Sequence, residues 1–95
     1  MMFKKDHGIL LILETGMDLS DAEQAFVLYK KPSGASGILE AQINGTAIEK
    51  EIPPNFLDEV GHWEFQARVT GPSFRLTGKP AKYYVAETLF EEANP

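Results

Sequence analysis

The chain has 95 residues, with 9 Lys and Arg against 14 Asp and Glu, and its formal net charge is −5. This length corresponds to a single domain, and the acidic balance argues against nucleic acid or an anionic membrane as partner, because both bind basic surfaces. The absence of cysteine excludes disulfides, thiolate nucleophiles and zinc–thiolate or iron–sulfur sites.

The first apolar segment covers residues 9–13 and follows Lys4 and Lys5. It ends at Glu14, which makes it shorter than the ~7–15 residues of a signal-peptide core, and no small-residue cleavage site follows. No stretch of the chain approaches the ~20 apolar residues of a transmembrane helix. We therefore expect a fully buried strand at residues 9–13, no secretion by a signal peptide and no membrane partner.

Residues 20–31 carry two competing patterns. Residues 20–23 (Ser-Asp-Ala-Glu) fit a helix capping box, and apolar residues follow at helical spacing. Residues 26–29 (Phe-Val-Leu-Tyr) are rich in strand-forming types, and a turn at residues 32–34 (Pro-Ser-Gly) follows soon after, which is typical of a strand. The residues themselves favour a strand and leave a helix as the alternative.

The most definite turn in the chain is Asn44-Gly45. This pair is typical of a type I′ hairpin turn, in which both loop residues have positive φ. With these two residues as the loop, Ile43 pairs with Thr46 and Glu40 lies opposite Glu49, a like-charge pair that costs roughly a few tenths of a kcal/mol. One face of the hairpin is then apolar and the other is acidic.

Residues 62–70 form the best-defined strand, because Trp63, Phe65 and the apolar residues after them alternate with polar ones. A glycine-containing turn at residues 71–73 leads into a second strand, which makes a hairpin. Pro80 separates this hairpin from a last strand.

Six or seven short strands in a chain of this length predict an all-β fold, in the form of a small antiparallel β-sandwich. Residues 53–61 are expected to cross between the hairpins with one helical turn. The end of this segment resembles the corner that enters strand F of immunoglobulin-like domains, through Asp58, Gly61 and Trp63. Trp63 stands where the corner has a tyrosine, and Asp58 lies one residue further from the small residue than in antibodies. The resemblance implies an immunoglobulin-like sandwich of about seven strands.

No motif in the sequence predicts catalysis or a cofactor. His62 and Glu64 match part of a zinc deaminase motif, but the cysteines of that motif are absent, and we expect both side chains on the solvent face of a strand. Gly78-Lys79 fails as a phosphate-binding P-loop, because Pro80 follows where the motif needs Ser or Thr. No nucleophile, base and acid form a recognisable set. We therefore predict that the chain is not an enzyme and has no catalytic residue and no cofactor.

Two groups of acidic residues each allow a second interpretation. The first group is Asp18, Asp21 and Glu23. It lacks the spacing of an EF-hand, so we expect a turn, with a weak calcium site as the alternative. The second group is Glu40, Glu49 and Glu51. We expect it to form a solvated hairpin face that discourages edge-to-edge pairing, with a site for a cation or a basic protein surface as the alternative. We predict no metal site.

Two further motifs have an ordinary structural interpretation. Trp63, Phe65 and Phe74 would suit a sugar-binding platform if they were exposed, but their alternation with polar residues favours packing in the core. Residues 44–46 (Asn-Gly-Thr) match an N-glycosylation sequon, and we expect them to form a turn.

The order of turn and core signatures along the chain supports a more specific resemblance. In chain order they are Asp6-His7-Gly8, Thr15-Gly16-Met17-Asp18-Leu19-Ser20, Lys30-Lys31-Pro32-Ser33-Gly34, the Asn44-Gly45 hairpin and Leu57-Asp58-x-x-Gly61-x-Trp63. This order resembles the immunoglobulin-like domain at the N-terminus of phage baseplate upper proteins, and small phage and prophage structural proteins of similar size. The resemblance covers about residues 5–86.

The resemblance implies a strand at residues 22–31 and a single domain at residues 1–86, followed by an acidic tail or docking peptide at residues 87–95. It implies a non-enzymatic structural role in a phage tail or baseplate, with no catalytic residue to carry over. The implied partners are other phage structural proteins, and a homo-oligomer is compatible with this role. The implied location is the virion, or the host cytoplasm before assembly.

Three classes of function make different structural demands. A virion or tail-assembly component predicts an exposed edge strand or apolar patch. A free-standing carbohydrate- or protein-binding module predicts a concave face with exposed aromatic side chains. An enzyme or metal protein requires a pocket that holds carboxylates or histidines of perturbed pKa. The sequence favours the first class and leaves the second as the alternative.

Overall fold

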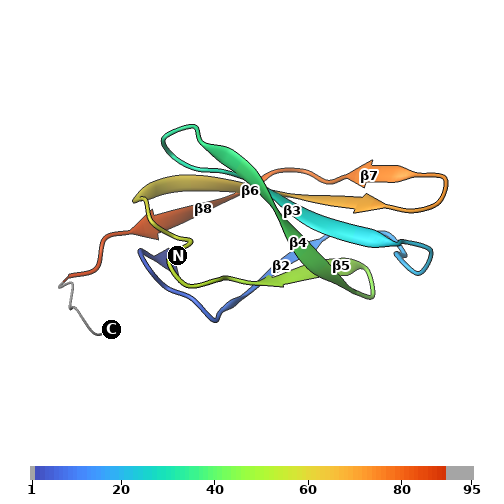
Figure 1. Cartoon of the computed structure of the whole chain (residues 1–95), viewed down its shortest axis with the longest axis horizontal. Helices are drawn as coiled ribbons and strands as arrows, with labels where there is room; N and C mark the ends of the chain where they lie inside the picture. The colour runs from blue at the N-terminus through green and yellow to red at the C-terminus, as the bar shows by residue number, and fades with distance from the viewer. Residues whose placement is uncertain (1, 90–95) are drawn as a thin grey trace.

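The computed structural model describes residues 2–89, which form eight strands and no helix (Figure 1). The strands are β1 (Met2–Phe3), β2 (Leu10–Glu14), β3 (Gln24–Lys30), β4 (Ser36–Asn44), β5 (Ala47–Glu51), β6 (Gly61–Thr70), β7 (Arg75–Thr77) and β8 (Ala81–Ala86). The all-β fold class predicted from the sequence is confirmed. Within the described residues there is no helix that is long and apolar enough to cross a membrane.

A single hydrogen-bonded sheet contains the eight strands, in the order β1-β8-β6-β3-β4-β5-β2, with β7 also paired to β6. β1 and β8 run parallel and the other neighbours run antiparallel, so the sheet is mixed. The sheet curls into a half-barrel at β4, because residues 36–41 of this strand pair with β3 whereas residues 42–44 pair with β5. Since β4 belongs to both halves, the structure does not show the two separate layers of a sandwich.

The core lies inside the curled sheet and centres on β6. Trp63 and Phe65 of this strand are completely buried, and the alternation predicted for residues 62–70 is confirmed. The expectation that these two aromatic residues belong to the core is also confirmed. The opposite end of the sheet contributes Leu11, Leu13, Ile48 and Ile52 to the same cluster. Apolar side chains from both ends of the sheet therefore enclose one core.

The prediction of a fully buried strand at residues 9–13 is wrong. Leu11 and Leu13 are buried, but Leu10 is 54% exposed and Ile12 is 51% exposed. The reason is that β2 is the last strand of the sheet, so only one of its faces meets the core. A continuous apolar run is consistent with burial on both faces, and here it belongs to an edge strand with one open face.

The hairpin between β4 and β5 forms, but its predicted register is wrong by two residues. Asn44 pairs with Ala47, which makes Gly45 and Thr46 the loop, and only Gly45 has a positive φ, of 65°. Asn44 instead belongs to β4, where its side-chain amide donates to Glu49 at 2.9 Å. Because a shift by two residues preserves which side chains share a face, the acidic and apolar faces remain as predicted.

The corrected register also removes the predicted like-charge pair. Glu49 lies opposite Gln42, not opposite Glu40. The carboxylate of Glu49 accepts a hydrogen bond from Asn44. Repulsion between directly opposite glutamates therefore does not arise in this hairpin.

The two uncertain segments of the sequence have clear conformations. Residues 24–30 form strand β3, so the strand interpretation is confirmed and the helix alternative is wrong. The predicted helical turn in residues 53–61 is also wrong. A β-turn takes its place, in which Phe56 donates its backbone N–H to the carbonyl of Pro53 at 3.3 Å. Asn55 has a φ of 63°, and a residue that tolerates positive φ after Pro54 is typical of a type II turn.

The C-terminal segment is described only as far as Leu89. Glu87 lies 3.7 Å from the ammonium group of Lys4, and Leu89 is fully exposed. Residues 90–95, and with them most of the predicted tail or docking peptide, lie outside the described residues. The division of the chain at residue 86 stays a prediction.

Candidate interaction surface

Strand β2 presents an open backbone edge. Its hydrogen-bonded neighbour is β5, and the ladder is fixed by two bonds, from Ile52 N–H to the Ile9 carbonyl at 2.8 Å and from Thr15 N–H to the Thr46 carbonyl at 3.0 Å. Because bonded residues alternate along an antiparallel ladder, residues 9, 11, 13 and 15 face β5. The N–H and C=O groups of residues 10, 12 and 14 therefore point to the side on which no strand pairs within the described residues.

The same residues that carry the open backbone groups carry exposed apolar side chains. Leu10 and Ile12 lie on the outer face of the sheet, each with about half of its surface exposed. On the neighbouring strand Glu51 lies opposite Leu10, and Glu49 lies opposite Ile12. Directly opposite residues share a face in an antiparallel pair. The β2 edge therefore combines an apolar strip with a row of carboxylates beside it.

A hollow of about 490 Å³ lies next to this strip. It forms because β4 turns away from β5 toward β3, so the two strands separate beyond the pair Gln42 and Glu49. The lining residues are Gly8, Leu10, Glu40, Ala41, Gln42, Glu49, Lys50 and Glu51. The second acidic group predicted from the sequence is thus brought together around one hollow.

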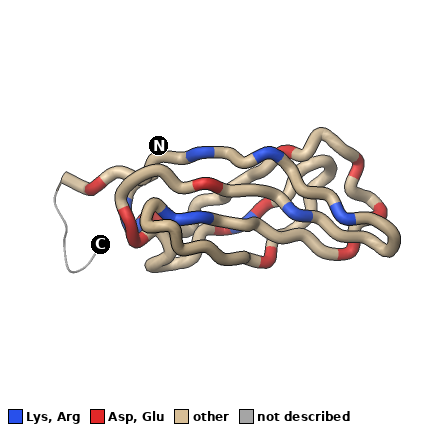
Figure 2. Tube along the Cα trace, turned by 90° about the horizontal axis from the view of Figure 1, so that it is seen from above, with Lys and Arg blue, Asp and Glu red and all other residues tan. Residues whose placement is uncertain are grey.

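Within residues 2–89, the glutamates of this hollow form no ion pair with a basic side chain. Among the described residues, the recorded ion pairs are Lys4 with Glu87 and Lys31 with Asp58, and neither involves the hollow. Elsewhere in the fold, charged residues of both signs are spread along its length (Figure 2). The grouping of three carboxylates around the hollow is therefore a local feature. No group of three or more His, Cys, Asp or Glu side chains in residues 2–89 is placed to hold a metal ion.

Glu14 adds a further negative charge at the end of β2. Its carboxylate accepts the backbone N–H of Gly16 at 2.7 Å. This hydrogen bond lowers the pKa of Glu14 below its ordinary value, because it favours the ionised form. The end of the β2 edge therefore stays negatively charged into the acid range.

The opposite edge of the sheet is protected. β8 is covered at Val85 and Ala86 by β1, and the Lys4 N–H donates to the Ala86 carbonyl at 2.8 Å. Pro80 precedes the strand, and Lys82 stands in its uncovered part. Short exposed edges, prolines and lysines are the features by which proteins prevent edge-to-edge pairing. β2 therefore offers the more accessible edge for a partner strand.

The other residues singled out in the sequence do not form a site. His62 packs on Tyr84, with ring centroids 5.1 Å apart, and Glu64 lies opposite Lys82. Gly78 belongs to the turn after β7, where its N–H donates to the Ala67 carbonyl at 2.9 Å. These residues complete strands and turns and do not converge on a pocket.

The first acidic group and the aromatic residues are likewise structural. The Asp18 carboxylate accepts the Ser20 N–H at 2.9 Å, which confirms the predicted turn. Trp63 and Phe65 are buried, but the expectation of core packing is wrong for Phe74, which lies in the β6–β7 turn and is 38% exposed. The three aromatic residues therefore do not make a common platform for a sugar. Residues 44–46 end a strand and form the hairpin loop, as expected.

The sequence did not predict a cluster that ties the loops to the core. The indole N–H of Trp63 donates to the carbonyl of Glu59 at 2.9 Å. Lys31 lies 5.5 Å from the centre of the Trp63 ring and 3.0 Å from Asp58. The hydrogen bond to Asp58 raises the pKa of Lys31 above its ordinary value. These contacts hold the β3–β4 loop against the segment before β6, and no local pattern links Lys31 with residues so distant in the chain.

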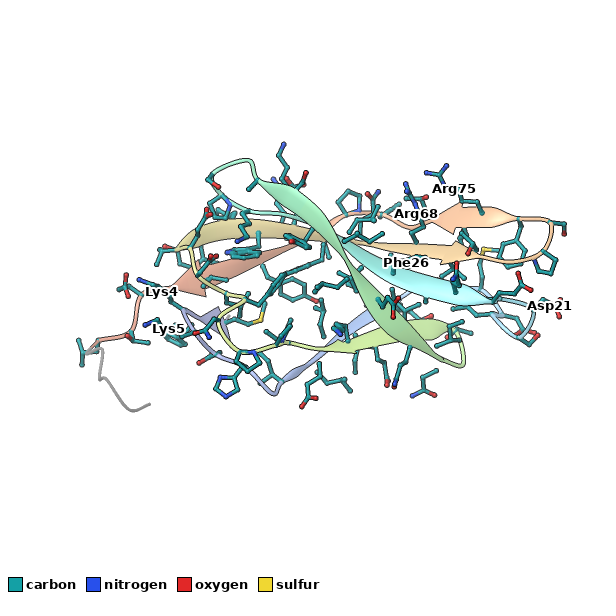
Figure 3. All side chains as sticks on the ribbon, in the orientation of Figure 1. Lys4, Lys5, Asp21, Phe26, Arg68 and Arg75 are labelled. Carbon is teal, nitrogen blue, oxygen red and sulfur yellow. The ribbon has the colours of Figure 1, made fainter. Side chains whose placement is uncertain are left out.

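A second feature without a sequence signal lies on the outer face of β6. Arg68 and Phe26 are directly opposite on adjacent strands, and Arg75 projects from the neighbouring β7 (Figure 3). The Nε atom of Arg68 is buried and has no hydrogen-bond partner among the described residues. Packing against Phe26 explains its burial, since the stem of an arginine readily covers apolar surface.

Comparison of the chain with protein-family models, with curated proteins and with solved structures finds no match.

Proposed function

We propose that this chain is a non-enzymatic structural domain of a phage or prophage particle, of the tail or baseplate class, that acts through protein–protein contacts. The observation that carries the proposal is the open β2 edge with Leu10 and Ile12 exposed on it. Edge strands with exposed apolar side chains favour association with other chains, and monomeric proteins usually protect them. An assembly component requires such a surface, and an enzyme does not.

The strand arrangement supports the immunoglobulin-like part of this proposal. One half of the sheet has the order β8-β6-β3-β4, and the other pairs β5 with β2. With β6 as strand F, these halves correspond to strands G, F, C and C′ and to strands E and B. Trp63 supports the same assignment, because its bond back to Glu59 replaces the bond that a tyrosine corner makes to the upstream backbone.

The alternative function, a free-standing carbohydrate- or protein-binding module, requires exposed aromatic side chains on a concave face. The aromatic residues on the inner face of β6 are buried. The hollow beside β2 is lined by three glutamates, Lys50, Gln42, Leu10 and two small residues, without an aromatic residue. The sugar-binding form of this alternative is therefore the less favoured one.

Mass spectrometry of phage particles purified from the source cells after prophage induction tests the proposal. We expect the chain in intact particles at a copy number that is a fixed multiple of a tail or baseplate protein. Detection in the cells together with absence from both particles and assembly intermediates would refute it. A ligand screen for the binding-module alternative would then follow.

A further inference from the structure

The two ends of the strand order, β2 at one end and β1 with β8 at the other, differ so much in their protection that β2 is the one suited to receive a strand. The β8 edge carries Lys82 and is partly covered by β1. The β2 edge has neither a proline nor a lysine between Leu10 and Glu14, and its outward backbone groups belong to residues 10, 12 and 14. Unprotected edges of this kind are templates for strand addition.

Building on the proposed function, we infer that β2 binds an extended strand of a partner protein in which apolar residues alternate with Lys or Arg. Main-chain hydrogen bonds to residues 10, 12 and 14 supply the pairing, and the two faces of β2 select the side chains. Both faces of the added strand can be derived from the residues that it would lie beside.

The inner face of the added strand would meet the rim of the core. Leu11 and Leu13 point inward from β2 and are buried. A strand paired to β2 places its own inward side chains next to them, because neighbouring strands lie about 4.8 Å apart with their side chains in register. Apolar side chains at these positions extend the core, whereas charged ones would be desolvated without a partner.

The outer face of the added strand would meet an apolar strip and then carboxylates. Leu10 and Ile12 lie nearest, and Glu51 and Glu49 stand one strand further away. Two strand spacings are roughly 10 Å, a distance that a Lys or Arg and a Glu can bridge together. The long stem of a basic side chain covers Leu10 or Ile12 while its head reaches a carboxylate that has no ion-pair partner in the described structure.

The charge of the chain argues against two other occupants. A second copy paired through its own β2 would place Glu14, Glu49 and Glu51 of both copies on one face, and each chain carries a net charge of −5. Net charges of the same sign keep copies of a protein apart. The C-terminal segment of the chain carries Glu87, Glu91 and Glu92 and has the same sign. A basic partner strand is the occupant whose charge complements this edge.

The test uses a synthetic peptide of alternating Lys and Val, capped at both ends, and the same peptide with Glu in place of Lys. Titration of the full chain is followed by NMR, together with the hydrogen exchange of the backbone amides of Leu10, Ile12 and Glu14. We expect the Lys peptide to bind and to protect these three amides, with an affinity that falls as salt is added. The Glu peptide should neither bind nor protect.

Two variants with a matched control locate the binding. Ile12→Lys adds a positive charge on the strip and should weaken the affinity for the Lys peptide by about tenfold or more. Ile38→Lys is the control, because Ile38 is also an isoleucine on the outer face of a strand and has 54% exposure, and it should leave binding within about twofold of wild type. Glu51→Gln removes one carboxylate without changing the strip and should weaken binding about threefold.

Three results would overturn the inference. The first is that the Lys and Glu peptides bind equally well. The second is that the Lys peptide does not slow hydrogen exchange at the amides of residues 10, 12 and 14. The third is that these amides are protected without peptide, to a degree that rises with protein concentration. The last result would identify a second copy as the occupant. If one of these three results is obtained but the chain is found in particles, the strand-binding inference fails and the proposed function stands. If the chain binds the Lys peptide but is absent from particles and assembly intermediates, the proposed function fails and the inference about the β2 edge stands.

Discussion

Replacement of Trp63 by alanine is the perturbation for which the structure makes the sharpest prediction. The indole is completely buried and packs between Phe56 and Phe65, at centroid distances of 5.3 Å and 6.1 Å. Its N–H is the hydrogen-bond donor to the Glu59 carbonyl. A third ring, that of Tyr29, lies 6.4 Å from the indole. Trp63→Ala therefore removes core volume, three aromatic contacts and the bond that fixes the segment before β6.

The expected loss of stability follows from these contacts. Truncation of a buried Trp to Ala costs about 3–5 kcal/mol, because the cavity is only partly filled by relaxation. The loss of the indole N–H contributes about 1 kcal/mol or less, since Glu59 is only half-buried. A small domain has a total stability of roughly 5–15 kcal/mol, so this loss removes about a third of the stability at the upper end of the range and unfolds the domain at the lower end.

Urea unfolding followed by far-UV circular dichroism measures this loss, because Trp63 is the single tryptophan and its fluorescence disappears with the substitution. Phe74→Ala is the control, since Phe74 is an aromatic residue of the same hairpin with 38% exposure, and it should cost about 1 kcal/mol or less. Trp63→Phe keeps a ring in the core and should fall between the two. A loss below about 2 kcal/mol for Trp63→Ala would refute the central place of this side chain in the core.

Three further substitutions test a close contact in strand β4, the β4–β5 turn and the charge of Glu14. Gly37→Ala should lower the free energy of unfolding by about 1–3 kcal/mol, because a Cβ at this position would overlap the Tyr29 ring and force it to move. Chemical denaturation measures this loss, and an unchanged denaturation midpoint would contradict the close contact between Gly37 and Tyr29. Gly45→Ala should cost about 1–2 kcal/mol, because its φ of 65° is unfavourable for a residue with a Cβ; Thr46→Ala in the same loop is the control for thermal unfolding. The folded pKa of Glu14 is lowered, so its stabilising contribution is present above the unfolded pKa and is lost as the pH falls through the folded value. The melting temperature of Glu14→Gln should therefore lie below that of wild type at neutral pH and approach it in acid, and a difference that grows in acid would contradict the hydrogen bond to Gly16.

The sequence predicted those parts of the fold that have a local signal. The alternation in β6 specifies which side chains enter the core, since a residue on a strand faces the side opposite to its neighbours. The turn residues before and after this strand specify its hairpin with β7. The hairpin of β4 and β5 was predicted with its correct faces but with the wrong loop, because Asn44 and Gly45 alone do not determine which two residues leave the ladder.

The candidate surface was predicted only in part, for a physical reason. The acidic face of the β4–β5 hairpin follows from period-2 patterning, and the structure confirms it. The hollow depends on β4 leaving β5 for β3, which is a pairing between distant segments. The exposure of Leu10 and Ile12 depends on β2 being last in the sheet order. A run of consecutive apolar residues carries no information on whether a strand lies at the centre or at the edge.

The parallel pairing of β1 with β8 has a mechanical consequence. Met2 and Val85 are partners, although they lie near opposite ends of the described chain. Tension applied at residue 2 and at residue 89 would pull these two strands in opposite directions along their own axes. The bonds between them, including that from Lys4 to Ala86, would then be loaded together and not one after another. Resistance to force would be set by how fast this short clamp breaks, and the β2 edge would stay unstrained while the clamp holds.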